Sequence, residues 1–176
     1  MARLRWFRDA QQAHRLGRVE NDIPAIPHGP AGAPVDRDRA AAEAYVAGDG
    51  YAKAGMLEAP EIIRFVSSKR LKQGDRDPDP DLQLFVCECI DGPDAATLRP
   101  TAAADHHDYQ GSIIDRYMAH GPLRNDDGKG LLGSLFLIEV ADRNTAELLV
   151  ANEPMTAAGV FSEVRINRWR FGKSIS

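Results

Sequence analysis

The chain has 176 residues, of which 43% are hydrophobic and 27% charged, and its formal net charge is −4 at pH 7. This length allows one sizeable domain or two small ones that share a core. The slight acidity excludes the basic face of a typical nucleic-acid binder, so a small-molecule or protein partner is expected. No apolar run approaches the roughly 20 residues of a membrane span, and the start of the chain lacks the apolar core of a signal peptide, so we expect a cytoplasmic protein without membrane contact.

The first half of the chain is the first copy of an internal repeat. Residues 38–56 recur as residues 142–160 at a constant offset of 104, and His28-Gly29-Pro30 is mirrored by His120-Gly121-Pro122 at an offset of 92. This period is too long for a solenoid and indicates a duplicated α+β module. The change of offset means that the first copy lacks about one strand.

Within residues 1–66 the pattern predicts a helix-like start, a strand at 23–28, a helix at 38–47 and a strand at 61–67. Two strands of a complete unit have no clear counterpart in this half. Either residues 3–7 serve as a short first strand, or the half adds its elements to a sheet built elsewhere. The sequence leaves both alternatives open.

A polar segment at residues 67–81 separates the two halves. It contains two prolines, Pro78 and Pro80, each preceded by an aspartate. Because the residue before a proline disfavours the helical region, neither a helix nor a central strand is expected there. We interpret the segment as a linker between a half repeat at 1–66 and a domain at 82–176.

Residues 82–176 carry a regular succession of elements. The apolar pattern predicts a strand at 82–90, a helix followed by a short strand within 99–118, a turn at Gly121-Pro122, a strand at 134–140, a helix at 142–151 and a strand at 164–171. The order βαββαβ is that of the ferredoxin-like unit, an α+β fold. Five apolar residues are expected in or near the buried face of the sheet: Leu84, Val86, Leu135, Leu137 and Ile166.

The residue types in this region favour some site chemistries over others. Cys87 and Cys89 lie in an apolar run and are expected to be buried free thiols. The run Asp105–Asp108 contains ligand-type side chains, but adjacent residues on a helix point about 100° apart and cannot converge on one ion. We therefore expect neither a metal site nor a cofactor.

Four short motifs stand out in the second half: Arg99 with His106 and Tyr109, the pair Gly121-Pro122, the strand motif at 133–140, and residues 151–160 leading to a strand that ends in Trp169. Together they resemble the YciI-like (YCII-related) family, whose members are small dimeric α+β barrel proteins. The resemblance covers residues 82–172, with a degenerate partial repeat at about 10–66. It implies a ferredoxin-like unit that forms a dimeric α+β barrel, with an incomplete N-terminal repeat.

The resemblance also implies a candidate site. The family's histidine and aspartate fall on His106 and Glu153, which are the predicted catalytic pair. Arg99, Tyr109 and His120 are the predicted substrate-binding residues. The first copy offers a possible second site with His14, which lies 15 residues before Gly29 as His106 lies 15 before Gly121, and with Asp49.

The function implied by the resemblance is a cofactor-independent lyase or isomerase, similar to the family's dehydrochlorinase and to muconolactone isomerases. A histidine is suited to proton transfer near neutral pH, and a carboxylate bound to it fixes its tautomer. The alternative is a non-catalytic module for small-molecule binding or assembly. A homodimer is expected, because an open four-stranded sheet with helices on one face leaves its other face to be covered. If the chain is a monomer, an internal pseudo-dimer of the two halves is the leading interpretation.

Overall fold

The computed structural model describes residues 3–7, 18–19, 39–55, 61–70 and 79–170. The predicted strand at 23–28 lies outside these residues. The elements in chain order are β1 Arg3–Phe7, β2 Arg18–Val19, α2 Arg39–Gly48, α3 Gly50–Lys53, β3 Glu61–Phe65, β4 Lys69–Arg70, β5 Gln83–Asp91, α4 Ala95–Ser112, η2 Ile114–Arg116, β6 Tyr117–Arg124, β7 Leu131–Val140, α5 Arg143–Ala151, α6 Pro154–Ala157 and β8 Phe161–Arg170.

Strands β5 to β8 form the centre of the sheet. Their spatial order is β6-β7-β5-β8, and every neighbouring pair is antiparallel. With α4 after β5 and α5 after β7, this is the ferredoxin-like βαββαβ arrangement. The predicted α+β fold class and ferredoxin-like unit are therefore confirmed.

The elements of the first half extend this sheet at both edges. Strand β3 pairs with β6, and β2 pairs with β8. Strand β4, which lies in the segment at 67–81 rather than in the first half, also pairs with β6. Residues 3–7 form a strand, β1, rather than the beginning of a helix, and it joins the same sheet as the C-terminal strands through β3. However, β1 pairs with β3 in parallel, whereas β5 and β8 are antiparallel, so the first half does not copy the second half's sheet.

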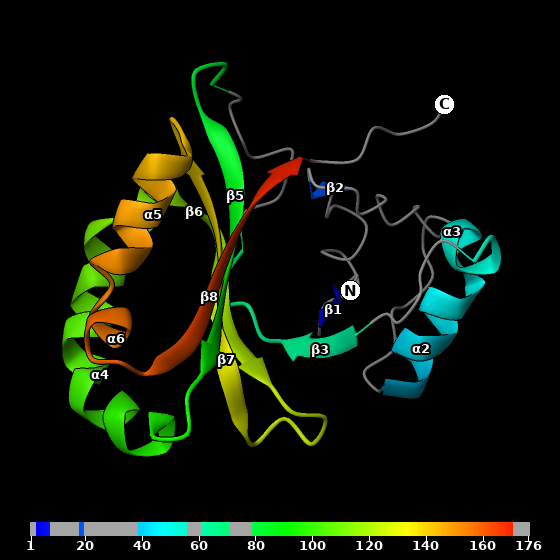
Figure 1. Cartoon of the computed structure of the whole chain (residues 1–176), viewed down its shortest axis with the longest axis horizontal. Helices are drawn as coiled ribbons and strands as arrows, with labels where there is room; N and C mark the ends of the chain where they lie inside the picture. The colour runs from blue at the N-terminus through cyan, green and yellow to red at the C-terminus, as the bar shows by residue number, and fades with distance from the viewer. Residues whose placement is uncertain (1–2, 8–17, 20–38, 56–60, 71–78, 171–176) are drawn as a thin grey trace.

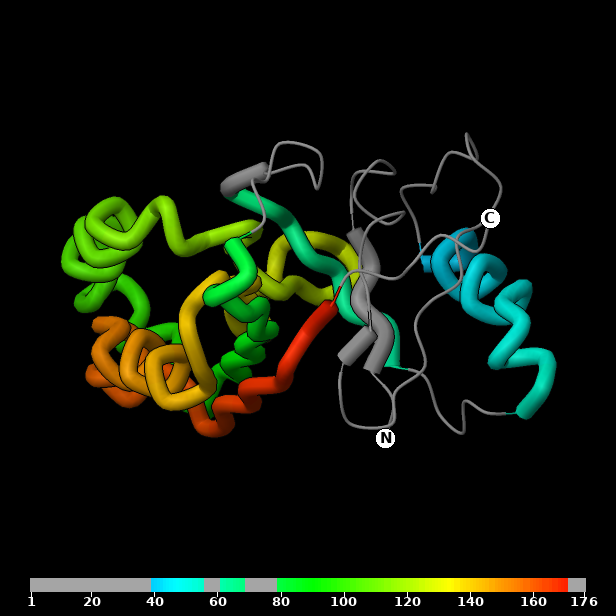
Figure 2. The backbone as a smooth tube through the Cα atoms, turned by 90° about the horizontal axis from the view of Figure 1, so that it is seen from above, coloured from blue at the N-terminus to red at the C-terminus, as the bar shows by residue number. Residues whose placement is uncertain are grey.

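Two groups of helices flank the strands. Helices α4, α5 and α6 lie on one side of the central sheet, and α2 and α3 lie on the other side (Figure 1). Seen from above, the two groups are at opposite ends of the molecule (Figure 2). Among the described helices, none is long and apolar enough to cross a membrane.

Both faces of the central sheet are buried. The face beneath α4 and α5 carries a cluster that includes Phe85, Cys87, Phe136, Ile138 and Val140, with Ala146 and Val150 from α5. The opposite face carries Leu84, Met118, Leu137 and Trp169, and next to them Ile63 and Phe65 of β3 pack on Leu123 and Leu135. Three of the five predicted apolar residues, Leu84, Leu135 and Leu137, are buried, whereas Val86 and Ile166 are partly buried.

Gly121 lies inside β6, so the predicted turn at Gly121-Pro122 is wrong. The strand continues to Arg124 because the chain just after β3 runs alongside it. The Val66 amide donates to the Pro122 carbonyl (3.1 Å), and the Ser68 amide donates to the His120 carbonyl (2.7 Å). A Cβ on Gly121 would lie 2.0 Å from the Val66 carbonyl oxygen, so this crossing requires glycine.

We expect the substitution Gly121→Ala to lower the free energy of unfolding by about 1–3 kcal/mol, since the new methyl group overlaps a backbone atom. Gly111→Ala is the matched control, because nothing lies within 4 Å of that position in α4. Alanine there is expected to stabilise the helix slightly. Urea unfolding of both variants measures the difference. Equal stability of the two would mean that residues 66–68 do not cross Gly121 in solution.

The internal repeat extends to individual contacts. The Arg39 guanidinium donates to the Ile62 carbonyl at 3.0 Å, and 104 residues later Arg143 donates to the Ile166 carbonyl at 2.7 Å. Both contacts tie the first turn of a helix, α2 or α5, to the strand that follows it. The same local contacts therefore hold the two helix–strand units together, while the division of the chain at residues 66 and 81 stays a prediction.

Candidate functional site

The face of α4 that packs on the sheet is unusually polar. Its buried residues are Ala95, Ala102, His106 and Gln110, spaced by seven and four positions and therefore on one side of the helix. Buried polar side chains normally have hydrogen-bond partners. His106 and Gln110 are therefore expected to bond to a protein group or to a ligand, and this face of α4 does more than pack against the sheet. Their neighbours in sequence, Asp105, His107 and Asp108, are exposed.

His106 and Glu153 form a buried pair. Their exposed fractions are 8% and 1%, and His106 Nδ1 is in hydrogen-bond contact with Glu153 Oε1. The other carboxylate oxygen, Oε2, accepts the Thr156 amide at 3.1 Å, so Glu153 also caps the first turn of α6. One carboxylate thus anchors α6 and holds the histidine that α4 supplies.

This contact determines which ring nitrogen of His106 carries the proton. A carboxylate accepts hydrogen bonds, so Nδ1 of a neutral His106 carries the proton and donates it to Glu153. The Nε2 atom then carries the lone pair, and it has no hydrogen-bond partner among the described residues. Such a histidine has one ring nitrogen fixed by its partner and the other available as a base.

Arg99 is held by the protein on several sides. Its guanidinium forms a two-pronged ion pair with Asp91 at 2.8 and 2.6 Å, and it also donates to Ser134 Oγ at 3.2 Å and contacts the Met155 sulfur at 3.3 Å. The two charged side chains are each 12% exposed. Arg99 therefore links β5, β7 and α6 to α4, and Asp91 balances its charge.

Tyr109 and His120, the other predicted substrate-binding residues, lie on the same side of the sheet. The Tyr109 hydroxyl donates to the Leu149 carbonyl at 2.8 Å, which ties α4 to α5. Burial and the Glu153 charge raise the pKa of Tyr109 above its usual value. His120 is 7% exposed, and its ring centroid lies 4.7 Å from that of Tyr117.

The possible second site is only partly described. Asp49 is half-buried and caps α3, with Oδ1 accepting the amides of Tyr51 at 2.7 Å and Ala52 at 3.3 Å. It thus occupies the same local position as Glu153, at the start of a four-residue helix. His14 lies outside the described residues, so a His14–Asp49 pair stays a prediction.

Three residues near the pair were missed by the sequence reasoning. Asp91 neutralises Arg99, Gln110 lies one helical turn after His106, and Tyr117 begins β6 on the helix-facing side. The i, i+4 spacing of His106 and Gln110 was a usable signal. The other two are brought to the site only by the packing of α4 on the sheet. No cluster of three or more metal-ligating side chains exists within the described part of the chain.

The two cysteines are expected to be unreactive in the folded protein. Both are completely buried, and burial raises the pKa of the Cys87 thiol from about 9 to about 12 and that of Cys89 further still. Since the thiolate is the reactive form, little of it exists at pH 8. A thiol reagent at pH 8 should modify neither cysteine before unfolding and both in guanidinium chloride. Fast modification of the native protein would contradict this burial.

A family model covers the part of the chain that forms the central sheet. Residues 83–170, half of the chain, match a family model described as "YCII-related domain", and this range runs from β5 through β8. No curated protein matches the chain. Among solved structures, the chain is similar to the 5-chloro-2-hydroxyhydroquinone dehydrochlorinase of Burkholderia phenoliruptrix AC1100 in complex with 2,5-dihydroxybenzoquinone, with 26% identity, a TM-score of 0.46, and coverage of 49% of this chain and 93% of that one.

Proposed function

Because the chain belongs to the YCII-related domain family, we propose that it is a small-molecule-processing enzyme, a cofactor-independent lyase or isomerase that works by proton transfer. His106 is the general acid or base, and Glu153 orients it. The observation that carries the proposal is the buried contact between His106 Nδ1 and Glu153 Oε1 beneath α4.

The proposed chemistry uses the two ring nitrogens of His106 in different ways. Nε2 takes a proton from a carbon of the substrate, and the Glu153 carboxylate stabilises the imidazolium that forms. The proton then returns to another position of the substrate in an isomerisation, or assists the departure of a leaving group in an elimination. The pair is nearly dry, which strengthens the interaction between the imidazolium and the carboxylate.

The proposed substrate is a small cyclic compound with an acidic C–H next to a carbonyl or enol. Such a proton is within reach of a neutral imidazole base, without a metal or an organic cofactor. Asp91 neutralises Arg99, so this arginine of the described site is not an unbalanced cation that would favour a phosphate or a polyanion. This supports a substrate that is neutral or weakly anionic.

Solvent-deuterium exchange tests the proposal directly. 2,5-Dihydroxybenzoquinone and a panel of small cyclic enols and unsaturated lactones are incubated in D2O, and the loss of each C–H signal is followed by proton NMR. We expect the protein to accelerate exchange of at least one class above the buffer rate. If no compound of the panel exchanges faster in its presence, the proposed proton transfer is wrong.

The second candidate is a non-catalytic binding or assembly module. It is favoured by the capping contact of Glu153 with Thr156, which gives the carboxylate a structural use independent of any reaction. Isothermal titration with the same panel separates the two functions. Binding without accelerated exchange supports the module, whereas binding with exchange supports the enzyme.

The homodimer expected from the resemblance is part of the proposal, but the sheet face that was expected to form its interface is covered within one chain. The sheet face opposite α4 is buried within a single chain, with Leu123 at 0% and Leu137 at 5% exposed, and β3 packs against it. We expect a dimer to form on another surface. Sedimentation equilibrium measures its mass against 19.3 kDa for one chain. A monomer at micromolar concentration would remove the homodimer and leave the internal pseudo-dimer.

A further inference from the structure

We propose that the Tyr117 hydroxyl, together with the Gln110 amide of α4, binds the substrate oxygen that becomes negatively charged when His106 removes a proton. This inference rests on the proposed function and adds a second part to its site. It starts from two buried polar side chains that the His106–Glu153 pair does not use.

Tyr117 is fixed in the core by its ring. It is 3% exposed, and its ring centroid lies 4.7 Å from that of His120 and 5.9 Å from that of Phe136. Ile113 and Leu149 pack against the same cluster. These contacts leave the ring little freedom, so the position of its hydroxyl is set before any ligand binds.

The hydroxyl itself is not used by the fold. Among the residues that the structure describes, it has no hydrogen-bond partner, whereas the hydroxyl of Tyr109, a residue of α4, donates to the Leu149 carbonyl. The Tyr117 ring is buried, but the hydroxyl oxygen is not one of the fully buried unpartnered atoms of the described residues, so it is accessible from outside the protein. A donor that is accessible and that the fold does not use is available to a ligand. The hydroxyl therefore points to a ligand rather than to packing.

Tyr117 is also electrostatically coupled to the catalytic pair. Burial raises its pKa most, and the charges of Tyr109 and Glu153 raise it further, so it stays protonated at ordinary pH. A protonated phenol donates a hydrogen bond. The group that it receives must be an acceptor, such as a carbonyl or an enolate oxygen.

Gln110 supplies a second donor on the same side. It is 9% exposed and lies one helical turn after His106, and no described residue forms a hydrogen bond with its side-chain amide. Gln110 shares the buried face of α4 with His106, and Tyr117 lies on the sheet face beneath that helix. Two donors on this side match the needs of enolate formation, in which charge moves from the C–H carbon to the neighbouring oxygen. Donors placed where charge develops lower the barrier of the step.

The inference therefore narrows the substrate class. The acidic C–H must be on a saturated carbon adjacent to a carbonyl, as in a cyclic ketone, a lactone or the keto tautomer of a hydroxyquinone, so that one oxygen contacts Tyr117 while the carbon faces His106 Nε2. In the step, Nε2 bonds to the proton and the C–H electron pair becomes the enolate π bond. The carbonyl electrons move to the oxygen held by Tyr117 and Gln110.

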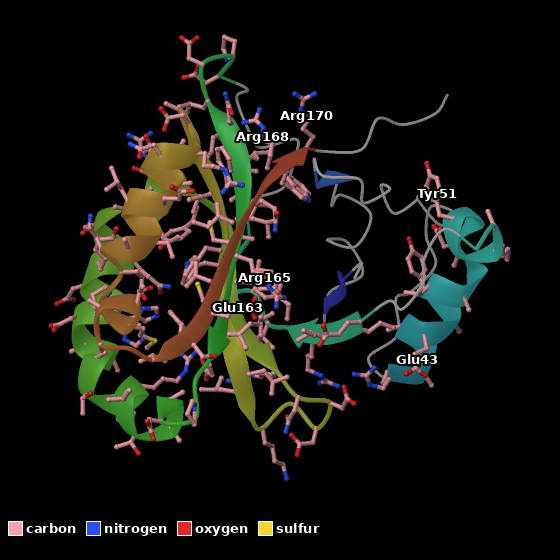
Figure 3. All side chains as sticks on the ribbon, in the orientation of Figure 1. Glu43, Tyr51, Glu163, Arg165, Arg168 and Arg170 are labelled. Carbon is pink, nitrogen blue, oxygen red and sulfur yellow. The ribbon has the colours of Figure 1, made fainter. Side chains whose placement is uncertain are left out.

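The variant Tyr117→Phe tests this assignment, because it removes only the hydroxyl. We expect its exchange rate on the panel compound that the wild type exchanges fastest to fall on the order of 100-fold, mainly in kcat, while its melting temperature stays the same or rises. Tyr51→Phe is the matched control, since Tyr51 is 36% exposed on α3, on the other side of the sheet from α4 (Figure 3). It should change neither quantity.

Each outcome decides the inference separately from the proposed function. An unchanged exchange rate in Tyr117→Phe, with exchange lost in His106→Gln, would overturn the inference alone. A marked fall in melting temperature would show that the hydroxyl has a partner inside the protein, and it would overturn the inference whether or not any compound exchanges. If the wild type exchanges nothing, the proposed function fails, and the melting temperature of Tyr117→Phe still decides whether the hydroxyl is unpartnered.

Discussion

The substitution His106→Gln is expected to lower the proton-exchange rate by about 100-fold or more, the usual worth of a positioned acid or base. Glutamine has no group that titrates near neutral pH, so it cannot take the proton. Its side-chain amide is still able to donate to Glu153 Oε1, in place of Nδ1–H. Because the buried carboxylate keeps a partner, the melting temperature should change little.

His107→Gln is the matched control for this prediction. His107 is the next residue of α4, its ring centroid lies 5.5 Å from that of His106, and it is exposed. Proton NMR exchange rates and thermal melts of both variants are compared with the wild type. An equal loss of activity in the two variants would indicate a general effect on α4, and full activity in His106→Gln would exclude this histidine as the proton carrier.

The second half of the fold could be predicted because its signals are local. Apolar runs and alternation place the strands near β5, β7 and β8, and Asp142 before an apolar helix pattern gives the start of α5, where its side chain accepts the Thr145 amide. The end of β6 could not be predicted in this way. Gly121-Pro122 is typical of a turn, and only the crossing of residues 66–68 over Gly121 explains why the strand continues there.

The candidate site could likewise be predicted only in part. The positions of His106 and Glu153 follow from family motifs, and the structure brings the two side chains together although they are 47 residues apart. The partners of Arg99 and Tyr109 could not be read from spacing, because Asp91 and the Leu149 carbonyl reach them only after α4 docks on the sheet and on α5. Both residues, predicted to bind substrate, also hold the helices in place.

The substitution Glu153→Gln is expected to lower activity as much as His106→Gln, on the order of 100-fold or more. An amide in place of the carboxylate loses the charge that stabilises the imidazolium. If its NH2 group faces Nδ1, the proton is forced onto Nε2, and the base is lost in the wrong tautomer. The amide oxygen is still able to accept the Thr156 amide, so the cap of α6 and the stability of the fold should largely survive.

Asp49→Asn is the counterpart in the first copy and should have a mild effect on activity. Asp49 occupies the same capping position, but it is half-buried and its Oδ1 serves the amides of Tyr51 and Ala52, which an asparagine oxygen can also accept. Exchange rates of the two variants, with melting temperatures as the check on folding, decide which copy works. The opposite outcome is loss of activity in Asp49→Asn and in a His14→Ala variant, with full activity in Glu153→Gln. It would place the active site in the first copy, because the half-buried Asp49 and not the buried Glu153 would then be the carboxylate that the reaction needs.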